Sequence, residues 1–267
     1  MIEDLIKNNK PIMIARLGAT EAKAVIYPKL NWFLRKILKK IIFERMFKWS
    51  GFFPVNEEAI KKFSNLYRDD LKLIDILASW RIEETLISEA KNIKKKINLQ
   101  ELEPYLNNNP WTNALKGKKV LVIHPFAKTI QIQYLKRKKI FSDQNVLPNF
   151  ELTTIKAIQS LSGENKNYSS WFDALNFLKN EIDKKQKEFD IALIGCGAYG
   201  LPLAAHVKRI GKIGIHMGGC LQILFGIKGK RWDNHKIISN LYNVNWVRPS
   251  EEDKPLSYKK VEDGCYW

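Results

Sequence analysis

The sequence predicts one α/β domain over residues 1–267, built on a single Rossmann-like, mostly parallel sheet. Three observations favour this class. Short apolar runs alternate with segments of helical spacing, glycines directly follow some of those runs, and residues 189–225 contain the succession strand, tight turn and helix twice. That succession is typical of a parallel βαβα unit, in which each helix crosses over one face of the sheet.

The βαβα unit contains two glycine turns. Phe189–Ile194 has the composition of a buried strand, and residues 201–210 have helical spacing; Lys212–Met217 then predicts a second strand, and Cys220–Phe225 another short helix. Glycines let a backbone approach a ligand, and a following helix presents free N–H groups to an anion. We therefore expect phosphate or nucleotide binding, and the alternative is that the glycines serve only turns and packing. The candidate residues are Gly195, Gly197, Tyr199 and Gly200 in the first turn, and His216, Gly218, Gly219 and Gln222 in the second.

The glycine spacing also matches a dinucleotide-binding fingerprint formally. That fingerprint requires an acidic residue about 20 positions further on to bind a ribose hydroxyl. Here the next strand ends in His216 and Met217 instead. This departure argues against NAD as the ligand.

The remaining strands are expected at residues 12–15, 119–123 and 149–157, and helices at 2–9, 29–48 and 170–187. Residues 56–98 are mostly helical in period, which predicts a helical insertion over about 28–110. The aromatic-rich tail, 242–267, is expected to pack across the domain or to line the edge of a cleft.

Several side chains that could do chemistry follow strands directly. Arg16, Gly18 and Glu21 come after the first strand, His124 ends another, and Lys128 lies shortly beyond it. Parallel sheets bind ligands at the carboxyl ends of their strands. Glu21 is a candidate metal ligand, base or ribose contact, or simply an acid at a helix start. His124 is a candidate base, or a hydrogen-bonded structural residue.

The composition favours anionic partners. Forty-five Lys and Arg outnumber 28 Asp and Glu, which gives a formal charge of +17, and such an excess suits phosphorylated substrates or anionic lipid. The basic loop with Lys228, Lys230 and Arg231 suits a diphosphate, although surface loops also carry such charge by chance. No recognised nucleic-acid module accompanies the charge, so we expect no nucleic-acid partner. Common hydrolase, P-loop and zincin motifs do not occur.

The stretch 29–49 has a pattern typical of helices that lie on an anionic membrane. Lys29–Lys48 holds seven cations and one acid, a local charge of +6, and its aromatics continue to Trp49. Read as a helix, it has one apolar stripe formed by Leu34, Ile37, Leu38, Ile41 and Ile42. The alternative is that the aromatic residues belong to the core and only the cations reach water. The acidic N-terminal segment does not read as a secretory signal. We expect a cytoplasmic protein, in part peripheral at the inner membrane face.

The segment Ala15–Glu21, ARLGATE, resembles the Arg-Phe-Gly-Asp-Gly-Glu motif that begins GT-D-type glycosyltransferase domains. The matching residues are Arg16, Gly18 and Glu21, and Ala19 stands in place of the aspartate. In that family the motif follows the first strand of a Rossmann-like sheet, and its carboxylates help to hold a divalent metal (Mn or Mg) and a nucleotide sugar. The HPF and GCGAYG segments are also similar to those of proteins from bacterial surface-polysaccharide gene clusters.

The resemblance and the residues together predict a glycosyltransferase that moves a sugar from a nucleotide-sugar donor to a surface-glycan or lipid-linked acceptor. The base for the acceptor hydroxyl would be Glu21 or His124, and Glu21 would be the metal ligand. The leaving diphosphate would be held by Lys228, Lys230, Arg231 and the Gly195–Gly200 turn. Two alternatives stay open: a non-catalytic nucleotide-binding regulator or scaffold, and an NAD-linked oxidoreductase.

Overall fold

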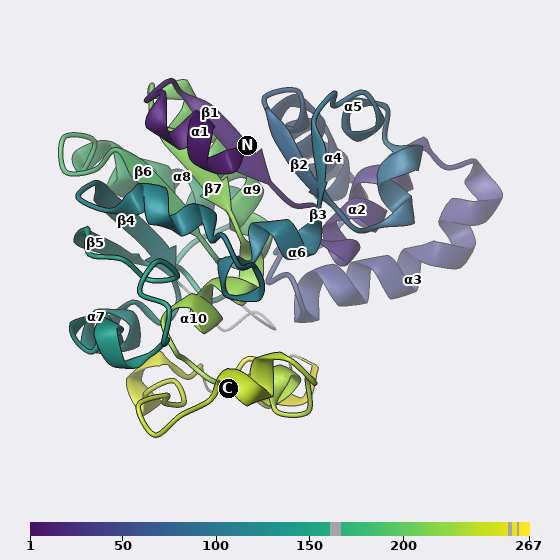
Figure 1. The fold of residues 1–267 in the computed structure, drawn as a ribbon. Helices are drawn as coiled ribbons and strands as arrows, with labels where there is room; N and C mark the ends of the chain where they lie inside the picture. Colours follow the sequence, from purple (N-terminus) through teal and green to yellow (C-terminus); the bar gives the residue numbers. More distant parts are fainter. Residues whose placement is uncertain (161–166, 256–257, 261) are drawn as a thin grey trace.

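A computed structural model describes residues 1–160, 167–255, 258–260 and 262–267, and it confirms the α/β class. One seven-stranded sheet, parallel throughout, has the order β3-β2-β1-β7-β6-β4-β5 (Figure 1). The strands are β1 (Ile12–Ala15), β2 (Ile76–Ser79), β3 (Lys96–Asn98), β4 (Lys119–His124), β5 (Glu151–Lys156), β6 (Ile191–Ile194) and β7 (Ile213–His216).

Helices cover both faces of the sheet. They are α1 (Ile2–Lys7), α2 (Ala19–Ile26), α3 (Trp32–Lys48), α4 (Glu57–Leu71), α5 (Ser88–Lys91), α6 (Leu99–Leu102), α7 (Ala127–Leu135), α8 (Trp171–Lys184), α9 (Gly200–Arg209) and α10 (Leu221–Leu224). Side chains of α1, α7 and α10 join one buried cluster, and those of α2, α4, α8 and α9 join a second. Ile12 and Ile14 belong to the first cluster, whereas Met13 and Ala15 belong to the second. A strand that is buried on both faces appears in the sequence as a continuous apolar run, which is why β1 could be predicted from the sequence.

The first strand lies beside the last. Ile12 of β1 is in register with Ile213 of β7, and Ile14 with Ile215. Helix α9 packs closely on β7, because a Cβ at Gly214 would lie 2.5 Å from the carbonyl oxygen of Ala204. The residues that follow β1 are thereby brought next to those that follow β7, although 200 positions separate them in the chain.

The prediction of a helical insertion over 28–110 is wrong in one respect, because this region also contains β2 and β3. Both are strands of the main sheet, and β2 pairs with β1. The carboxylate of Asp75, just before β2, accepts hydrogen bonds from the backbone N–H of Met13 and from Nζ of Lys208, both at 2.7 Å. A four-residue apolar run next to helices cannot be distinguished from helix by periodicity alone.

Helix α3 begins at Trp32 rather than Lys29, because the side chain of Asn31 caps it by accepting a 2.9 Å hydrogen bond from the backbone N–H of Leu34. The apolar stripe expected on this helix does not pack as a stripe. In the whole helix only Ile42 and Met46 are buried. None of the described helices has the length and apolar content needed to cross a bilayer.

Candidate active site

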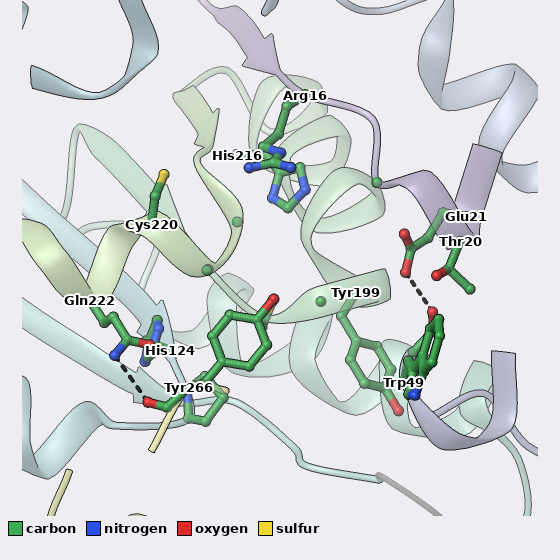
Figure 2. Close-up of a pocket in the computed structure, with 18 of the residues that line it drawn as sticks. Arg16, Thr20, Glu21, Trp49, His124, Tyr199, His216, Cys220, Gln222 and Tyr266 are labelled. Atoms are coloured by element: carbon green, nitrogen blue, oxygen red, sulfur yellow. Dashed lines mark hydrogen bonds between the residues drawn. The ribbon is translucent and has the colours of Figure 1, made fainter. Parts of the chain in front are cut away.

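A pocket of about 570 Å³ lies at the carboxyl edge of the sheet. Its walls are built by residues at or shortly after the carboxyl ends of all seven strands, so it occupies the place where parallel sheets bind ligands. Most of the candidate residues predicted from the sequence lie in its lining (Figure 2). They are Arg16, Gly18, Glu21, His124, Gly195, Gly197, Tyr199, His216, Gly218, Gly219, Gln222 and Arg231.

Arg16 directly follows β1 and lies next to Gly218, which follows β7. Its guanidinium lies over the ring of Trp80, 4.6 Å from the centroid, and that ring is held in place because its indole N–H donates to the carbonyl of Leu17 at 2.9 Å. Gly218 has a φ of +71°, and a Cβ there would lie 3.3 Å from Cδ of Arg16. Within the described ranges, no carboxylate oxygen lies within 4.0 Å of the Arg16 guanidinium. An oriented cation of this kind is suited to binding an anion.

Glu21 lies in the first turn of α2, across the pocket from His124 and Gln222 (Figure 2). Its Oε1 accepts a 2.7 Å hydrogen bond from the hydroxyl of Ser50, just beyond the end of α3. A Cβ on Gly18 would lie 1.9 Å from its Oε2. The glycine of the Ala15–Glu21 motif therefore makes room for the carboxylate that closes the motif.

His124 is the last residue of β4 and is only 3% exposed. Its Nδ1 accepts a 3.0 Å hydrogen bond from the backbone N–H of Phe126, so the neutral ring carries its hydrogen on Nε2. Burial lowers the pKa of His124 to about 3. The ring is therefore neutral near pH 7, and it is better suited to donate from Nε2 than to accept a proton.

His216 is the equivalent residue at the end of β7. Burial, assisted by the positive charge of Arg16, lowers its pKa to about 3. Gly200 does not line the pocket but lies behind this ring, because a Cβ there would be 2.2 Å from both Cε1 and Nδ1 of His216. Because Gly200 has no side chain, α9 is able to begin against the His216 ring. Of the two roles considered for this glycine, ligand binding and packing, the structure therefore shows packing.

Three lysines expected at the site do not reach it. Lys128 forms an ion pair with Glu252, and Lys228 places its ammonium over the ring of Tyr242, 5.1 Å from the centroid. Lys230 donates from Nζ to the carbonyl of Asp263 at 3.4 Å. None of the three lines the pocket. Counting cations along the chain cannot tell which side of a loop each one occupies.

Arg231 is the one cation of the 227–233 loop that lines the pocket. The loop is bound to the C-terminal segment, because the backbone N–H of Arg231 donates to the carbonyl of Cys265 at 2.9 Å. Its guanidinium donates to the hydroxyl of Tyr266 at 3.0 Å. Gln222, fully buried, donates from Nε2 to the carbonyl of the same tyrosine at 3.1 Å (Figure 2). Tyr266 and Trp267 line the pocket, which confirms that the tail contributes to a cleft.

The sequence did not single out several residues of the lining, above all Trp80, Glu103 and Ser50. Had β2 been recognised as a strand, Trp80 would have been placed at its carboxyl end. No local pattern distinguishes Glu103. Burial raises the pKa of this carboxyl although the nearby charge of Arg16 acts in the opposite direction, and a perturbed acid in a pocket is a candidate for proton transfer.

Tyr199 lines the pocket and is linked by hydrogen bonds to the segments that contain Ser160 and Gly51. Its hydroxyl shares a 2.8 Å hydrogen bond with Oγ of Ser160, which donates in turn to the carbonyl of Gly51 at 2.6 Å. Its ring stacks on that of Trp171 at 5.0 Å. We expect Tyr199→Phe to lower the free energy of unfolding by about 1 kcal/mol, because one buried hydrogen bond is lost while the stacking remains.

Urea unfolding followed by circular dichroism measures that change. Tyr168→Phe is the matched control, since the structure shows no hydrogen bond from the Tyr168 hydroxyl within the described part of the chain. Equal losses in both variants would contradict a specific role for the Tyr199 hydroxyl.

The pocket does not contain a complete set of protein ligands for a metal. The described residues include no group of three or more His, Cys, Asp or Glu side chains placed to hold one. Ala19 removes the aspartate that the family motif would supply, which leaves Glu21. A magnesium ion in nucleotide enzymes often takes one or two carboxylates and completes its shell with phosphates and water.

No protein-family model, no curated protein and no solved structure matches this chain.

Proposed function

We propose that the protein is a glycosyltransferase that uses a nucleotide-sugar donor. The observation that carries this proposal is the position of Arg16, oriented by Trp80 in a pocket that two glycine turns line. The donor's diphosphate would lie between this guanidinium and the turn at Gly195 and Gly197, which leads into α9. Helix α9 has ten residues, and its N-terminal end carries the positive end of the helix dipole.

The transfer step requires a base and a stabilised leaving group. The acceptor hydroxyl oxygen would attack the anomeric carbon of the sugar while the bond from that carbon to the diphosphate oxygen breaks. The bonding electrons stay on the diphosphate, whose developing charge Arg16 and Arg231 would stabilise. Both side chains line the pocket.

The hydroxyl proton would go to Glu21, which is the better of the two bases expected from the sequence. Its carboxylate accepts a hydrogen bond from Ser50 and lies beside the opening turn of α2. His124 has its Nδ1 occupied and a pKa lowered to about 3, so we assign it a donor role toward the sugar or phosphate. Glu103 is the second carboxyl within the pocket.

We further propose an alternative role for Glu21, in which it and the diphosphate would together hold one Mn²⁺ or Mg²⁺ and the base would be Glu103, the second carboxyl of the pocket. Such an ion would add positive charge next to the leaving group. The acceptor would be a surface glycan or a lipid-linked saccharide, and the enzyme would work peripherally at the inner membrane face.

Isothermal titration calorimetry with UDP, GDP, CDP and NAD, each with and without Mn²⁺, tests this proposal. We expect one nucleoside diphosphate to bind, with an affinity that Mn²⁺ increases, and the matching nucleotide sugar to release that diphosphate when acceptor is present. Binding of NAD alone would overturn the proposal in favour of an oxidoreductase. Binding of a diphosphate with no turnover of any sugar donor would favour a regulatory or scaffold protein.

A further inference from the structure

Helix α3 exposes a large apolar surface to solvent. It runs along the outside of the molecule, away from the sheet (Figure 1). Of its 17 residues only Ile42 and Met46 are buried, whereas Trp32 is 67% exposed, Phe33 62% and Ile37 56%. The core therefore does not account for the aromatic residues at the start of this helix.

Three of the exposed apolar side chains of α3 form one row. Phe33, Ile37 and Ile41 are spaced by four residues and so lie on one face. At about 100° per residue this face is roughly 160° around the helix from the buried Ile42 and Met46, so it points away from the core. All three side chains are exposed, Phe33 at 62%, Ile37 at 56% and Ile41 at 43%.

Two lysines flank the row. Lys36 and Lys40, also spaced by four, are exposed and form no ion pair with any described residue, and the ammonium of Lys36 lies over the ring of Trp32, 5.2 Å from its centroid. The single acid of α3, Glu44, is already paired with Lys48 at 2.5 Å. A convex apolar row with cations beside it complements an anionic lipid surface, where the apolar groups enter the interface and the ammonium groups meet the headgroup phosphates.

The C-terminal end of α3 leads into the pocket. Trp49, Ser50 and Gly51, which follow the helix directly, line the pocket, and Ser50 donates to Glu21. A 17-residue helix is about 25 Å long, so a docked α3 would hold the pocket within that distance of the lipid headgroups.

We infer that α3 is a membrane-docking helix, that its ligand is an anionic phospholipid surface, and that the acceptor is therefore the lipid-linked class. The part that concerns the acceptor rests on the proposed transferase function. The docking itself does not, because it depends only on the exposed row and its cations.

Vesicle co-sedimentation tests the inference. We use phosphatidylcholine vesicles with and without an equal part of phosphatidylglycerol, at low and at high salt. Wild-type protein should sediment with the anionic vesicles at low salt and be released at high salt. Lys36→Glu/Lys40→Glu should weaken the partition coefficient about 30-fold or more, and Phe33→Ser/Ile37→Ser/Ile41→Ser should abolish sedimentation.

Matched controls are available on α7 and on the turn that follows it, at a distance from α3 (Figure 1). Lys136→Glu/Lys138→Glu makes the same charge change at exposed lysines, and Ile132→Ser/Leu135→Ser removes exposed apolar side chains. Both should sediment as wild type does. The docking inference is overturned if wild type ignores anionic vesicles at low salt, if the controls lose as much binding, or if the exposed row instead forms a dimer that the serine variant dissolves in gel filtration.

Calorimetry with the nucleoside diphosphate on the same α3 variants separates this inference from the proposed function. The variants should bind the diphosphate as wild type does, because none of their altered residues lines the pocket. Vesicle binding without diphosphate binding would remove the transferase proposal and leave the docking helix. Diphosphate binding without vesicle binding would remove the docking helix and leave the transferase proposal.

Discussion

Replacing Arg16 with glutamine should lower kcat/KM for the nucleotide-sugar donor by about 10² to 10³-fold, as loss of one preorganised charged donor typically does. The guanidinium is oriented by Trp80 and by the close approach of Gly218 before any ligand arrives. Glutamine keeps a polar side chain, although a shorter one, and removes the charge and the stacking. Most of the loss should appear in kcat, because the diphosphate gains charge as it leaves.

The companion variants make this result specific. Arg16→Lys keeps the charge but loses the planar fork and the stacking, so it should recover only part of the activity. Lys128→Ala is the control, because its ammonium is paired with Glu252 outside the pocket. If Lys128→Ala is as damaging as Arg16→Gln, or if Arg16→Gln leaves donor turnover intact, the diphosphate does not bind where we place it.

The two buried histidines should make the protein less stable in mild acid. Their pKa values are lowered to about 3 in the folded protein, whereas an unfolded histidine titrates near 6.5. Between these values the unfolded chain binds protons that the folded chain excludes, so the stability is complete above about pH 7 and is lost progressively as the pH falls.

The expected size follows from the same values. From about pH 7.5 to about 5.5 each histidine should remove roughly 1.4 kcal/mol of stability, or about 2.7 kcal/mol for the pair. Asp70 acts in the opposite direction, because burial raises its pKa to about 6 despite its ion pair with Arg209. As the pH falls over the same interval, protonation of Asp70 in the folded protein adds somewhat less than 1 kcal/mol of stability. The net loss of stability is therefore about 2 kcal/mol.

Urea unfolding at both pH values measures the loss, and asparagine variants assign it. The side-chain oxygen of asparagine is able to replace Nδ1 of His124 as acceptor for the Phe126 N–H. His124→Asn and His216→Asn should each reduce the pH dependence by about 1.4 kcal/mol, whatever their effect at pH 7.5. Tyr199→Phe is the control, because it alters a buried side chain without changing the number of groups that titrate between these pH values, and it should keep the slope. A slope that survives both asparagine variants would assign the acid sensitivity to other groups.

The fold class and much of the pocket were readable from the chain. Strands β1, β4, β6 and β7 are buried on both faces, so their runs are apolar throughout and distinct from the helices between them. Glycines and polar residues that directly follow such strands must lie at one edge of a parallel sheet. This rule placed Arg16, Glu21, His124 and His216 together without any knowledge of strand order.

The tertiary structure alone decided which charged side chains face the pocket and which elements surround it. Strand β2 is too short for its period to be recognised, so Trp80 and its role beside Arg16 were not foreseen. The side that Lys228 and Lys230 occupy depends on backbone hydrogen bonds to Val247 and Trp267, which lie far from them in the sequence. Amphipathic spacing indicated that α3 has an apolar face, but the packing of α2 and α4 determines that this face remains exposed. Local patterns record what each segment buries on average, whereas orientation at a site is set by distant partners.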